Sequence, residues 1–265
     1  MNIPVTSLII STYNWPQALE LCLISVLNQS VFPAEVIIAD DGSGEETRQL
    51  IKKYEPAFKI PLKHIWHEDI GFRKTIILNK AIAESSSAYI VQIDGDVILD
   101  KNFISDHVTS AEKNTFIRGT RAMLTPEKTK ELIAKKSYAI SPFSSGVRNR
   151  NNAIRIFSLR SLGSRKEMSS RNVRGSNLSF WKKDFELVNG YNNDLTGWGH
   201  EDEELAARFI NNGIIKKIIK LCAIQFHLFH PVCAQEKETE HRFEIERVID
   251  EKVQICLNGY RTLSN

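Results

Sequence analysis

Strand-like and helix-like segments alternate through the first hundred residues, and this alternation constrains the fold more than any other feature of the chain. The predicted strands cover residues 5–10, 35–39, 62–66 and 88–93. The predicted helices cover residues 16–27, 45–54 and 73–84. Pro16 suits the first turn of a helix because its missing N–H would have no helical partner there. Such alternation predicts an α/β fold with a mostly parallel, doubly wound sheet flanked by helices.

Polar side chains gather where three of these strands end. Ser11 to Asn14 follow the first strand, Asp40 to Ser43 follow the second, and Asp94 to Asp96 follow the fourth. In open parallel sheets, ligands bind beyond the carboxyl ends of the strands. The coincidence of polar clusters with strand ends therefore predicts a ligand site at this edge of the sheet.

Asp94-Gly95-Asp96 pairs two carboxylates across one glycine. Mg²⁺ and Mn²⁺ prefer carboxylate oxygens and often bridge to a diphosphate, and Gly95 lets the backbone approach closely. Taken alone, such a triplet is commonly an ordinary turn. At the end of a parallel strand, beside the other polar clusters, it predicts a Mn²⁺ or Mg²⁺ site.

Asp40-Asp41-Gly42-Ser43 has two interpretations. It is either a turn with an Asx-type hydrogen bond or a carboxylate positioned on the polar edge of a nucleobase. In the second interpretation Tyr13, at the end of the first strand, flanks the same base.

The stretch from Gly197 to Leu205 places one aromatic ring between two glycines and beside an acidic run. The acids can simply favour a helix N-terminus. Alternatively, Trp198 stacks on a sugar face, and a neighbouring carboxylate binds hydroxyls or removes a proton as a general base. His227 and His230 follow a late strand-like segment, and one imidazole can complete the metal site. A zinc site is disfavoured because no thiolate or HExxH set accompanies them.

Residues 144–176 are rich in Ser, Arg and Asn, and between Arg148 and Arg174 the only acid is Glu167. We predict a mobile excursion with order returning at Asn177, serving either as a solvated loop or as a patch for phosphates or a membrane surface. The net charge of the whole chain is only +3, which does not argue for nucleic acid as a partner.

No leader sequence and no apolar run long enough for a membrane helix is visible, and the four cysteines form no CxxC pair. These observations predict reduced thiols and a cytoplasmic protein, with at most peripheral contact with the inner face of the membrane. Apolar residues recur at helical spacing over residues 236–257, which predicts an amphipathic helix in the tail.

The chain resembles bacterial members of glycosyltransferase family 2, which have the nucleotide-diphospho-sugar transferase (GT-A) fold. The last of its motifs also resembles that of the β1,4-galactosyltransferases and the bacterial chondroitin polymerase. The motifs are Ser11-Thr12-Tyr13-Asn14, Asp40-Asp41-Gly42-Ser43, Gly71-Phe72-Arg73-Lys74 with Asn79, Asp94-Gly95-Asp96, and Gly197-Trp198-Gly199-His200-Glu201-Asp202.

The resemblance implies one GT-A catalytic domain over residues 1–235. Residues 1–100 would form its nucleotide-binding half, and residues 101–235 its acceptor-binding half, which includes the basic segment 144–176. Residues 236–265 would form the C-terminal amphipathic helix.

The resemblance also implies a donor site. Asp40 or Asp41 would hold the base, expected to be uracil, and Asp94 would contact the ribose or the metal. The implied donor-binding residues are Thr12, Tyr13, Asn14, Asp40, Asp41, Arg73, Asn79, Asp94 and Gly95.

For the metal, the resemblance implies Asp96 and Asp94 as ligands, with His227 as the third protein ligand and His230 in reserve. For the acceptor, it implies contacts from Trp198, Gly199 and His230. Glu201 and Asp202 would be catalytic, with Asp202 as general base and Glu201 binding hydroxyls.

The implied reaction is a single, inverting displacement from a UDP-sugar to a glycan or glycolipid hydroxyl, in surface polysaccharide, capsule or lipopolysaccharide synthesis. The sugar would be galactose, N-acetylgalactosamine, glucose or N-acetylglucosamine. Two rival functions are a non-catalytic sugar-binding module and a sugar nucleotidyltransferase. The second would need a glycine-rich basic phosphate loop after the first strand, which the sequence lacks.

Overall fold

Four parallel strands form one side of the main sheet and follow the predicted boundaries closely. In a computed structural model that describes residues 3–231 and 237–264, they are β1 (Thr6–Thr12), β2 (Glu35–Asp40), β3 (Leu62–Trp66) and β4 (Tyr89–Asp94). The connecting helices are α1 (Pro16–Leu27), α2 (Glu45–Tyr54) and α3 (Lys74–Ala83). The strands lie in the order β3-β2-β1-β4, and all their pairings are parallel. The predicted βαβ arrangement of this half is confirmed.

These strands are apolar throughout because both faces of the sheet are covered. Leu8 and Ile10 of β1 pack into one core with α1 and α2, whereas Ile9 points into a second core with α3. A strand buried on both sides lacks the polar alternation of a half-exposed strand.

The second half of the main sheet is mixed. Strand β10 (Leu178–Trp181) runs antiparallel to both β4 and β6 (Thr115–Arg118), and β11 (Ile215–Ile218) runs parallel to β6. Strand β9 (Arg165–Glu167) then closes the eight-stranded sheet on its outer edge. The parallel prediction therefore holds for the first half, and β10 introduces the reversal.

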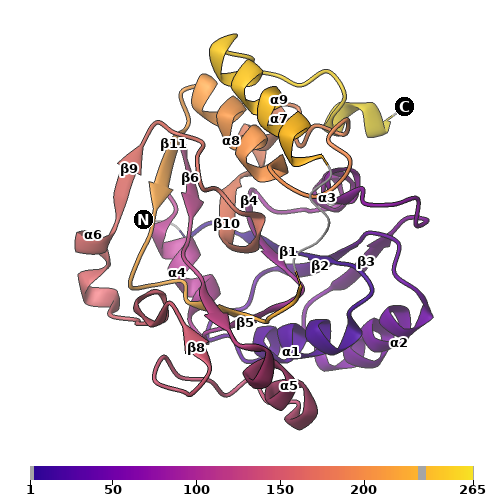
Figure 1. Cartoon of the computed structure of the whole chain (residues 1–265), viewed down its shortest axis with the longest axis vertical. Helices are drawn as coiled ribbons and strands as arrows, with labels where there is room; N and C mark the ends of the chain where they lie inside the picture. Colours follow the sequence, from indigo (N-terminus) through magenta and orange to yellow (C-terminus); the bar gives the residue numbers. More distant parts are fainter. Residues whose placement is uncertain (1–2, 232–236, 265) are drawn as a thin grey trace.

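A smaller four-stranded sheet lies beside the main one. It contains β5 (Val97–Leu99), β12 (Gln225–His227), β7 (Ala122–Leu124) and β8 (Val147–Arg148) in that order. The remaining helices are α4 (Phe103–Ser110), α5 (Pro126–Lys135), α6 (Arg160–Gly163), α7 (Lys182–Leu187), α8 (Glu201–Asn211) and α9 (Glu238–Asp250). In Figure 1, α1, α2 and α5 lie below the main sheet, and α7, α8 and α9 lie above it.

The basic segment 144–176 is more ordered than the sequence predicts. It contributes β8 to the small sheet and β9 to the main sheet, so regular structure returns before Asn177. The Arg155 guanidinium also donates two hydrogen bonds to the buried Asp106 carboxylate, at 2.7 and 2.9 Å. These contacts fasten the segment to the rest of the fold.

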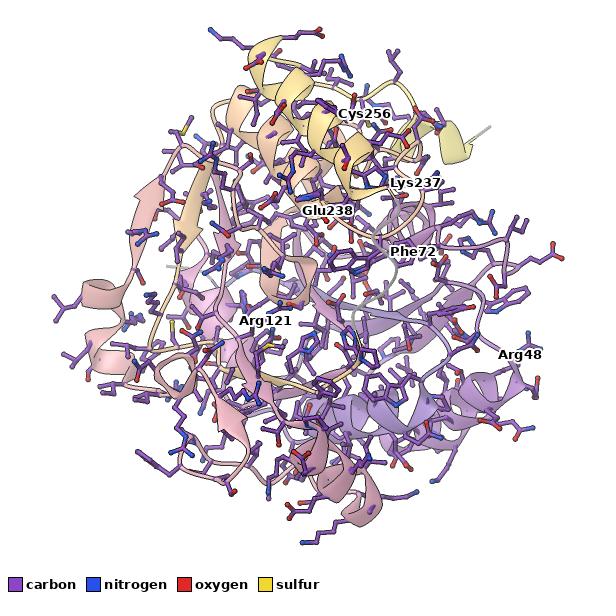
Figure 2. All side chains as sticks on the ribbon, viewed as in Figure 1. Arg48, Phe72, Arg121, Lys237, Glu238 and Cys256 are labelled. Carbon is purple, nitrogen blue, oxygen red and sulfur yellow. The ribbon has the colours of Figure 1, made fainter. Side chains whose placement is uncertain are left out.

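The tail helix is shorter than the range 236–257 predicted from its apolar spacing. Helix α9 ends at Asp250 because Lys252 adopts a left-handed backbone with φ of +52°, and the Val253 amide turns back to the Val248 carbonyl. Lys237 and Glu238 mark the start of α9 in Figure 2. The boundary expected between 235 and 236, and Cys233, lie outside the described residues. No helix among the described residues is long and apolar enough to cross a membrane.

Candidate functional site

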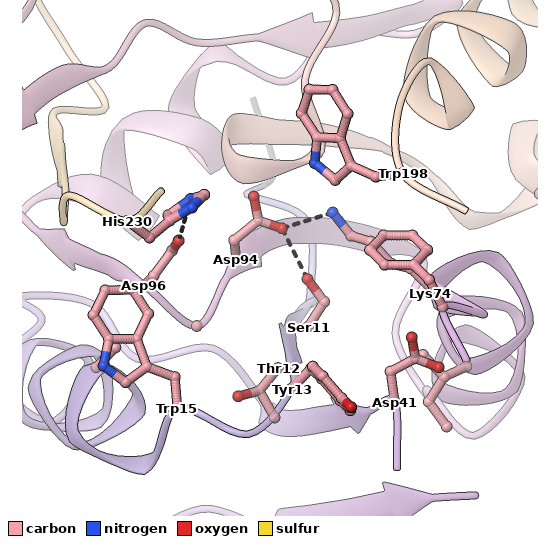
Figure 3. Close-up of a pocket in the computed structure, with 14 residues that line it drawn as sticks. Ser11, Thr12, Tyr13, Trp15, Asp41, Lys74, Asp94, Asp96, Trp198 and His230 are labelled. Atoms are coloured by element: carbon pink, nitrogen blue, oxygen red, sulfur yellow. Dashed lines mark hydrogen bonds and ion pairs between the residues drawn. The ribbon is translucent and has the colours of Figure 1, made fainter. Parts of the chain in front are cut away.

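A pocket of about 180 Å³ opens at the carboxyl ends of β1, β2 and β4, where the polar clusters were predicted to meet (Figure 3). Its lining residues are Ser11, Thr12, Tyr13, Trp15, Ala18, Asp41, Phe72, Lys74, Ile77, Asp94, Gly95, Asp96, Trp198 and His230. Segments far apart in the sequence therefore meet at one edge of the sheet, as the strand-end rule predicts.

Asp96, His227 and His230 form a cluster in which one ligand atom from each lies within 4.8 Å of the others. The two Nε2 atoms lie 3.5 and 3.2 Å from the Asp96 carboxylate oxygens. The Nδ1 atoms of His227 and His230 lie 2.7 and 2.8 Å from the backbone carbonyls of Leu228 and Pro231. If Nδ1 carries the proton donated there, Nε2 presents its lone pair to a metal.

The residues of this cluster fit a divalent cation. Asp96 Oδ1 is buried and accepts no hydrogen bond from the described residues, although a buried carboxylate oxygen normally has a partner. Both histidines lie in the cluster, so the geometry offers His230 as well as His227 as a candidate ligand, and the sequence-based preference for His227 stays a prediction.

Asp94 is held differently from Asp96. Its Oδ1 accepts hydrogen bonds from Lys74 Nζ at 2.9 Å and Ser11 Oγ at 2.8 Å (Figure 3). Burial alone would raise the pKa of Asp94, but the Lys74 charge and these hydrogen bonds outweigh it and lower the pKa to about 2. Asp94 is outside the three-residue cluster and is bound by protein groups, so its predicted role as a metal ligand is not supported by its contacts.

Gly95 is required by close packing between the two strand ends. Its amide donates to the Ser11 carbonyl at 2.7 Å, and a Cβ at this position would lie 3.1 Å from that oxygen. The glycine thus lets the Asp94–Asp96 turn sit against β1.

Lys74 is a site residue that the role assignments from sequence missed, although it belongs to the Gly71–Lys74 motif. It starts α3, lines the pocket, and lies 2.9 Å from Asp94 and 3.6 Å from Glu201. Burial opposes its charge, but Asp94, Asp202 and Glu201 hold the pKa of Lys74 well above its usual value. The Lys74 ammonium group therefore contacts one carboxylate of each pair that the sequence predicts to be functional.

Asp202 lies in the first turn of α8 and is largely buried. Its Oδ2 accepts a hydrogen bond from the Gly175 amide at 2.6 Å, and its Oδ1 accepts one from the Tyr191 hydroxyl at 2.9 Å. Burial raises the pKa of Asp202, the neighbouring Glu201 carboxylate adds to the effect, and the result is about 7. A carboxyl group that titrates near neutrality can both accept and release a proton.

The two aspartates at the end of β2 have separate surroundings. Asp40 is fully buried, and its carboxylate contacts His64 Nε2 at 2.8 Å and the Ser43 amide at 2.8 Å. Asp41 lines the pocket, contacts His67 Nε2 at 2.6 Å and accepts from the Arg73 amide at 2.9 Å. Of the two alternatives left open by the sequence, Asp41 is the one that lines the pocket, although it is itself largely buried.

The turn after β1 is shaped by Asn14, whose backbone is left-handed with φ of +44°. Its side-chain oxygen accepts from the Gly44 amide at 2.9 Å, and its own amide donates to Ser43 Oγ at 2.9 Å. Thr12 and Tyr13 line the pocket, and the Tyr13 hydroxyl donates to Asp69 at 2.9 Å. Asn14 therefore supports the turn, and Thr12 and Tyr13 face the ligand space.

Two predicted donor-pocket residues have structural roles instead. Asn79 is fully buried, where its amide bonds the backbone of Tyr191 and the side chain of Asn193 at 2.8 to 2.9 Å. The Arg73 guanidinium turns to the Glu68 carbonyl, outside the pocket lining. Neither side chain lines the pocket, because motif membership does not reveal the direction in which a side chain points.

Helix α9 holds the loop that carries Trp198. His241 Nδ1 lies 2.6 Å from the Gly199 carbonyl, and Lys237 Nζ donates to Thr196 Oγ1 at 2.9 Å. Gly197 and Gly199 have φ of +98° and +110°, conformations that other residues rarely adopt. No sequence motif indicated this contribution, since His241 lies 42 residues from Gly199 along the chain.

Comparison with known proteins agrees with this geometry. The model of "Glycosyl transferase family 2" matches residues 7–169, and that of the "N-terminal domain of galactosyltransferase" matches residues 156–231. The chain belongs to glycosyltransferase family 2. The resemblance inferred from the motifs is thereby confirmed, and the protein is an enzyme of the transferase class.

The curated relatives of this glycosyltransferase are longer. It is 25% identical over 264 residues to chondroitin synthase of Pasteurella multocida (strain Pm70), covering 93% of this chain and 27% of the relative. It is 24% identical over 251 residues to chondroitin synthase of Escherichia coli, covering 88% and 36%. Validoxylamine A glucosyltransferase of Streptomyces hygroscopicus subsp. limoneus is 27% identical over 229 residues, covering 80% and 49%. The glycosyltransferase thus spans between a quarter and a half of these relatives.

Solved structures confirm the GT-A fold. S. aureus TarS 1-349 superposes with a TM-score of 0.62 at 14% identity, covering 97% of this chain and 67% of that one. The mannosyltransferase PcManGT from Pyrobaculum calidifontis, solved in complex with GDP-Man and Mn²⁺, superposes with a TM-score of 0.59 at 16% identity, covering 91% and 61%.

Proposed function

We propose that this glycosyltransferase transfers one sugar from a UDP-sugar to a hydroxyl of a glycan acceptor, with inversion at the anomeric carbon and dependence on a divalent cation. The single observation that carries this proposal is Asp202, a buried carboxyl with a pKa of about 7 close to the charges of Lys74 and Glu201. A general base of this pKa suits deprotonation of a hydroxyl at neutral pH.

In this proposal Asp202 removes the proton of the acceptor hydroxyl while the hydroxyl oxygen attacks the anomeric carbon. The bond between that carbon and the diphosphate breaks, and the nucleoside diphosphate leaves. The Gly175 amide and the Tyr191 hydroxyl keep the Asp202 carboxylate oriented through their hydrogen bonds. Lys74 places a fixed positive charge in the pocket where the departing diphosphate gathers negative charge. Asp41 is the candidate partner for the uracil edge, and Trp198 for a sugar face.

Asp96, His227 and His230 would hold the cation, which when bound neutralises negative charge on the diphosphate. Two imidazoles and one carboxylate favour Mn²⁺ over Mg²⁺, because Mg²⁺ prefers oxygen ligands and keeps much of its water. The sugar is proposed to be galactose, N-acetylgalactosamine, glucose or N-acetylglucosamine. The named chondroitin synthases and TarS in complex with UDP support a UDP-sugar and a polysaccharide-type acceptor.

We further propose that the enzyme acts in the synthesis of surface polysaccharide, capsule or lipopolysaccharide, at the inner face of the cytoplasmic membrane. Leu162 and Met168, 81% and 56% exposed, lie beside the basic side chains of the 144–176 segment and support peripheral membrane contact. Co-sedimentation with vesicles containing anionic lipid tests this contact, which is rejected if Leu162→Ser leaves binding unchanged.

A donor screen tests the main proposal. Release of nucleoside diphosphate from UDP-, GDP- and CMP-sugars is measured with Mn²⁺, with Mg²⁺ and with chelator. We expect release from one UDP-sugar, faster with Mn²⁺, lost in Asp96→Ala and retained in Asp250→Ala, an exposed acid at the end of α9. Binding of glycan without release from any donor would instead establish the sugar-binding module.

A further inference from the structure

Three arginines lie on neighbouring segments: Arg118 ends β6, Arg121 precedes β7, and Arg174 precedes Gly175. Asn177 joins these segments, since its side chain donates to the Thr120 carbonyl at 2.8 Å and its carbonyl accepts from the Gly119 amide at 2.9 Å. The packing is so close that a Cβ on Gly119 would lie 2.1 Å from the Asn177 side-chain oxygen.

The arginine trio borders both functional carboxylates. Arg174 immediately precedes Gly175, whose amide donates to Asp202. Arg121 immediately precedes β7. In that strand Ala122 pairs with Phe226, and Met123 pairs with the metal-site residue His227. Arg174 therefore adjoins the residue that binds the proposed base, and Arg121 adjoins the strand that pairs with the proposed metal site.

No carboxylate within residues 3–231 and 237–264 pairs with any of these three guanidiniums. Within the same ranges, the trio's guanidiniums donate a single hydrogen bond, from Arg118 Nε to the Asn172 backbone carbonyl at 3.0 Å. By contrast, Arg155, Arg208 and Arg247 are all ion-paired, at 2.5 to 2.9 Å. The positive charges of these other arginines are balanced by neighbouring carboxylates, whereas, within the described part of the chain, those of the trio are not.

The environment of the trio is unfavourable for its charge. Burial lowers the pKa of Arg118 and of Arg121, and the neighbouring positive charge of Arg174 lowers both further, only partly offset by Glu167 at Arg118 and by Asp94 and Asp96 at Arg121. Guanidinium groups stay protonated in proteins. A bound anion, rather than loss of a proton, would therefore offset the burial and mutual repulsion of these charges. A carboxylate or phosphate matches the forked donors of arginine.

We propose that Arg118, Arg121 and Arg174 bind an anionic group of the acceptor glycan, a carboxylate or a phosphate close to the hydroxyl that is glycosylated. This inference rests on the proposed function and names its acceptor class as acidic. The trio selects acidic acceptors because a neutral glycan brings no negative charge to three neighbouring guanidiniums that pair with no carboxylate among the described residues.

Arg174→Gln is the first variant to test, because Arg174 is exposed and the change removes charge without emptying the core. Arg48→Gln is the matched control: it also removes an exposed arginine, and Figure 2 places Arg48 at the molecular edge, away from Arg121 near the centre. Arg174→Lys keeps the charge but loses the fork, and is expected to recover part of the effect.

The first arm measures binding of three oligosaccharide sets by calorimetry without donor: neutral, uronate-bearing and phosphate-bearing. We expect wild type to bind one acidic set, with Kd rising about tenfold in Arg174→Gln and unchanged in Arg48→Gln. The set that binds tells carboxylate from phosphate. Preference for neutral glycans, or equal Kd in wild type and Arg174→Gln, overturns the inference.

The second arm measures UDP affinity and donor hydrolysis, both expected to be unchanged in Arg174→Gln. A tenfold loss of UDP affinity instead assigns the trio to the donor diphosphate and overturns the acceptor assignment. Absence of UDP-sugar turnover in wild type would reject the proposed function separately, since the calorimetric arm needs no catalysis.

Discussion

Asp94, at the end of β4, and Asp202, at the start of α8, lie near the same lysine, Lys74, and differ in pKa. Asp94 is hydrogen-bonded to Lys74 and Ser11, and its pKa falls to about 2. Asp202 is held by a hydroxyl and an amide beside the Glu201 carboxylate, and its pKa rises to about 7. The Lys74 charge therefore outweighs burial at Asp94, whereas at Asp202 burial and the Glu201 carboxylate outweigh the same charge.

The largest expected effect comes from removing the proton acceptor. We expect Asp202→Asn to lower kcat by about 10³-fold or more, because general base catalysis typically contributes 10²- to 10⁴-fold and the amide cannot accept the proton. UDP affinity should remain near that of wild type. Asp184→Asn is the control, since Asp184 is also a buried acid with a raised pKa but lies on α7. Equal loss of kcat in both variants would contradict a catalytic role.

Removing the shared cation should weaken catalysis and change the pKa of Asp202. We expect Lys74→Met to lower kcat/KM by about 10²-fold, because a preorganised positive charge near the departing diphosphate is lost. The same change should raise the pKa of Asp202, since Lys74 lowers it. Steady-state kinetics across pH measures both effects. Lys80→Met, in the last turn of the same helix, should behave as wild type.

The pH dependence follows from the protonated fraction of Asp202. Because the base must be ionised, kcat/KM should rise with pH and level off above about 7. Glu201→Gln removes a like charge that raises the pKa of Asp202, so the rise should move to lower pH. A pH profile that stays in place in Glu201→Gln would argue that the two carboxylates are not electrostatically linked.

The smallest expected effect concerns the loop that leads into Glu201 and Asp202. His241→Phe removes the contact with the Gly199 carbonyl and should raise the acceptor KM several-fold while leaving kcat within about twofold. His241→Asn, which restores a donor, should recover part of the affinity. A fall in kcat with unchanged KM would instead indicate that His241 acts on the catalytic base Asp202 and not on acceptor binding.

The sequence predicted the first half of the fold well because β1, β2 and β4 are buried on both faces. It also located both carboxylate pairs, since each pair is contiguous in the chain and lies at the end of a strand or the start of a helix. It predicted the second half less well, because β9 and β10 join the sheet through pairings between distant segments.

Contacts across long sequence separations explain the remaining misses. Asn79 belongs to a motif, yet its side-chain amide hydrogen-bonds to the backbone of Tyr191, 112 residues away. Lys74 lies one residue after the assigned Arg73, and only the direction of α3 shows which of them faces the pocket. His241 and the arginine trio belong to no contiguous motif, so no local pattern could reveal them.

The position of β10 has a consequence for how the protein folds. Strand β10 lies between β4 and β6, so β6 and β11 cannot join the parallel strands until residues 178–181 have been synthesised. Until then, the edge of β4 offers unpaired backbone groups, which favour aggregation between nascent chains. Non-local pairing of this kind also slows folding. Chains that end before Leu178 should therefore aggregate, even though they contain the whole parallel half of the sheet.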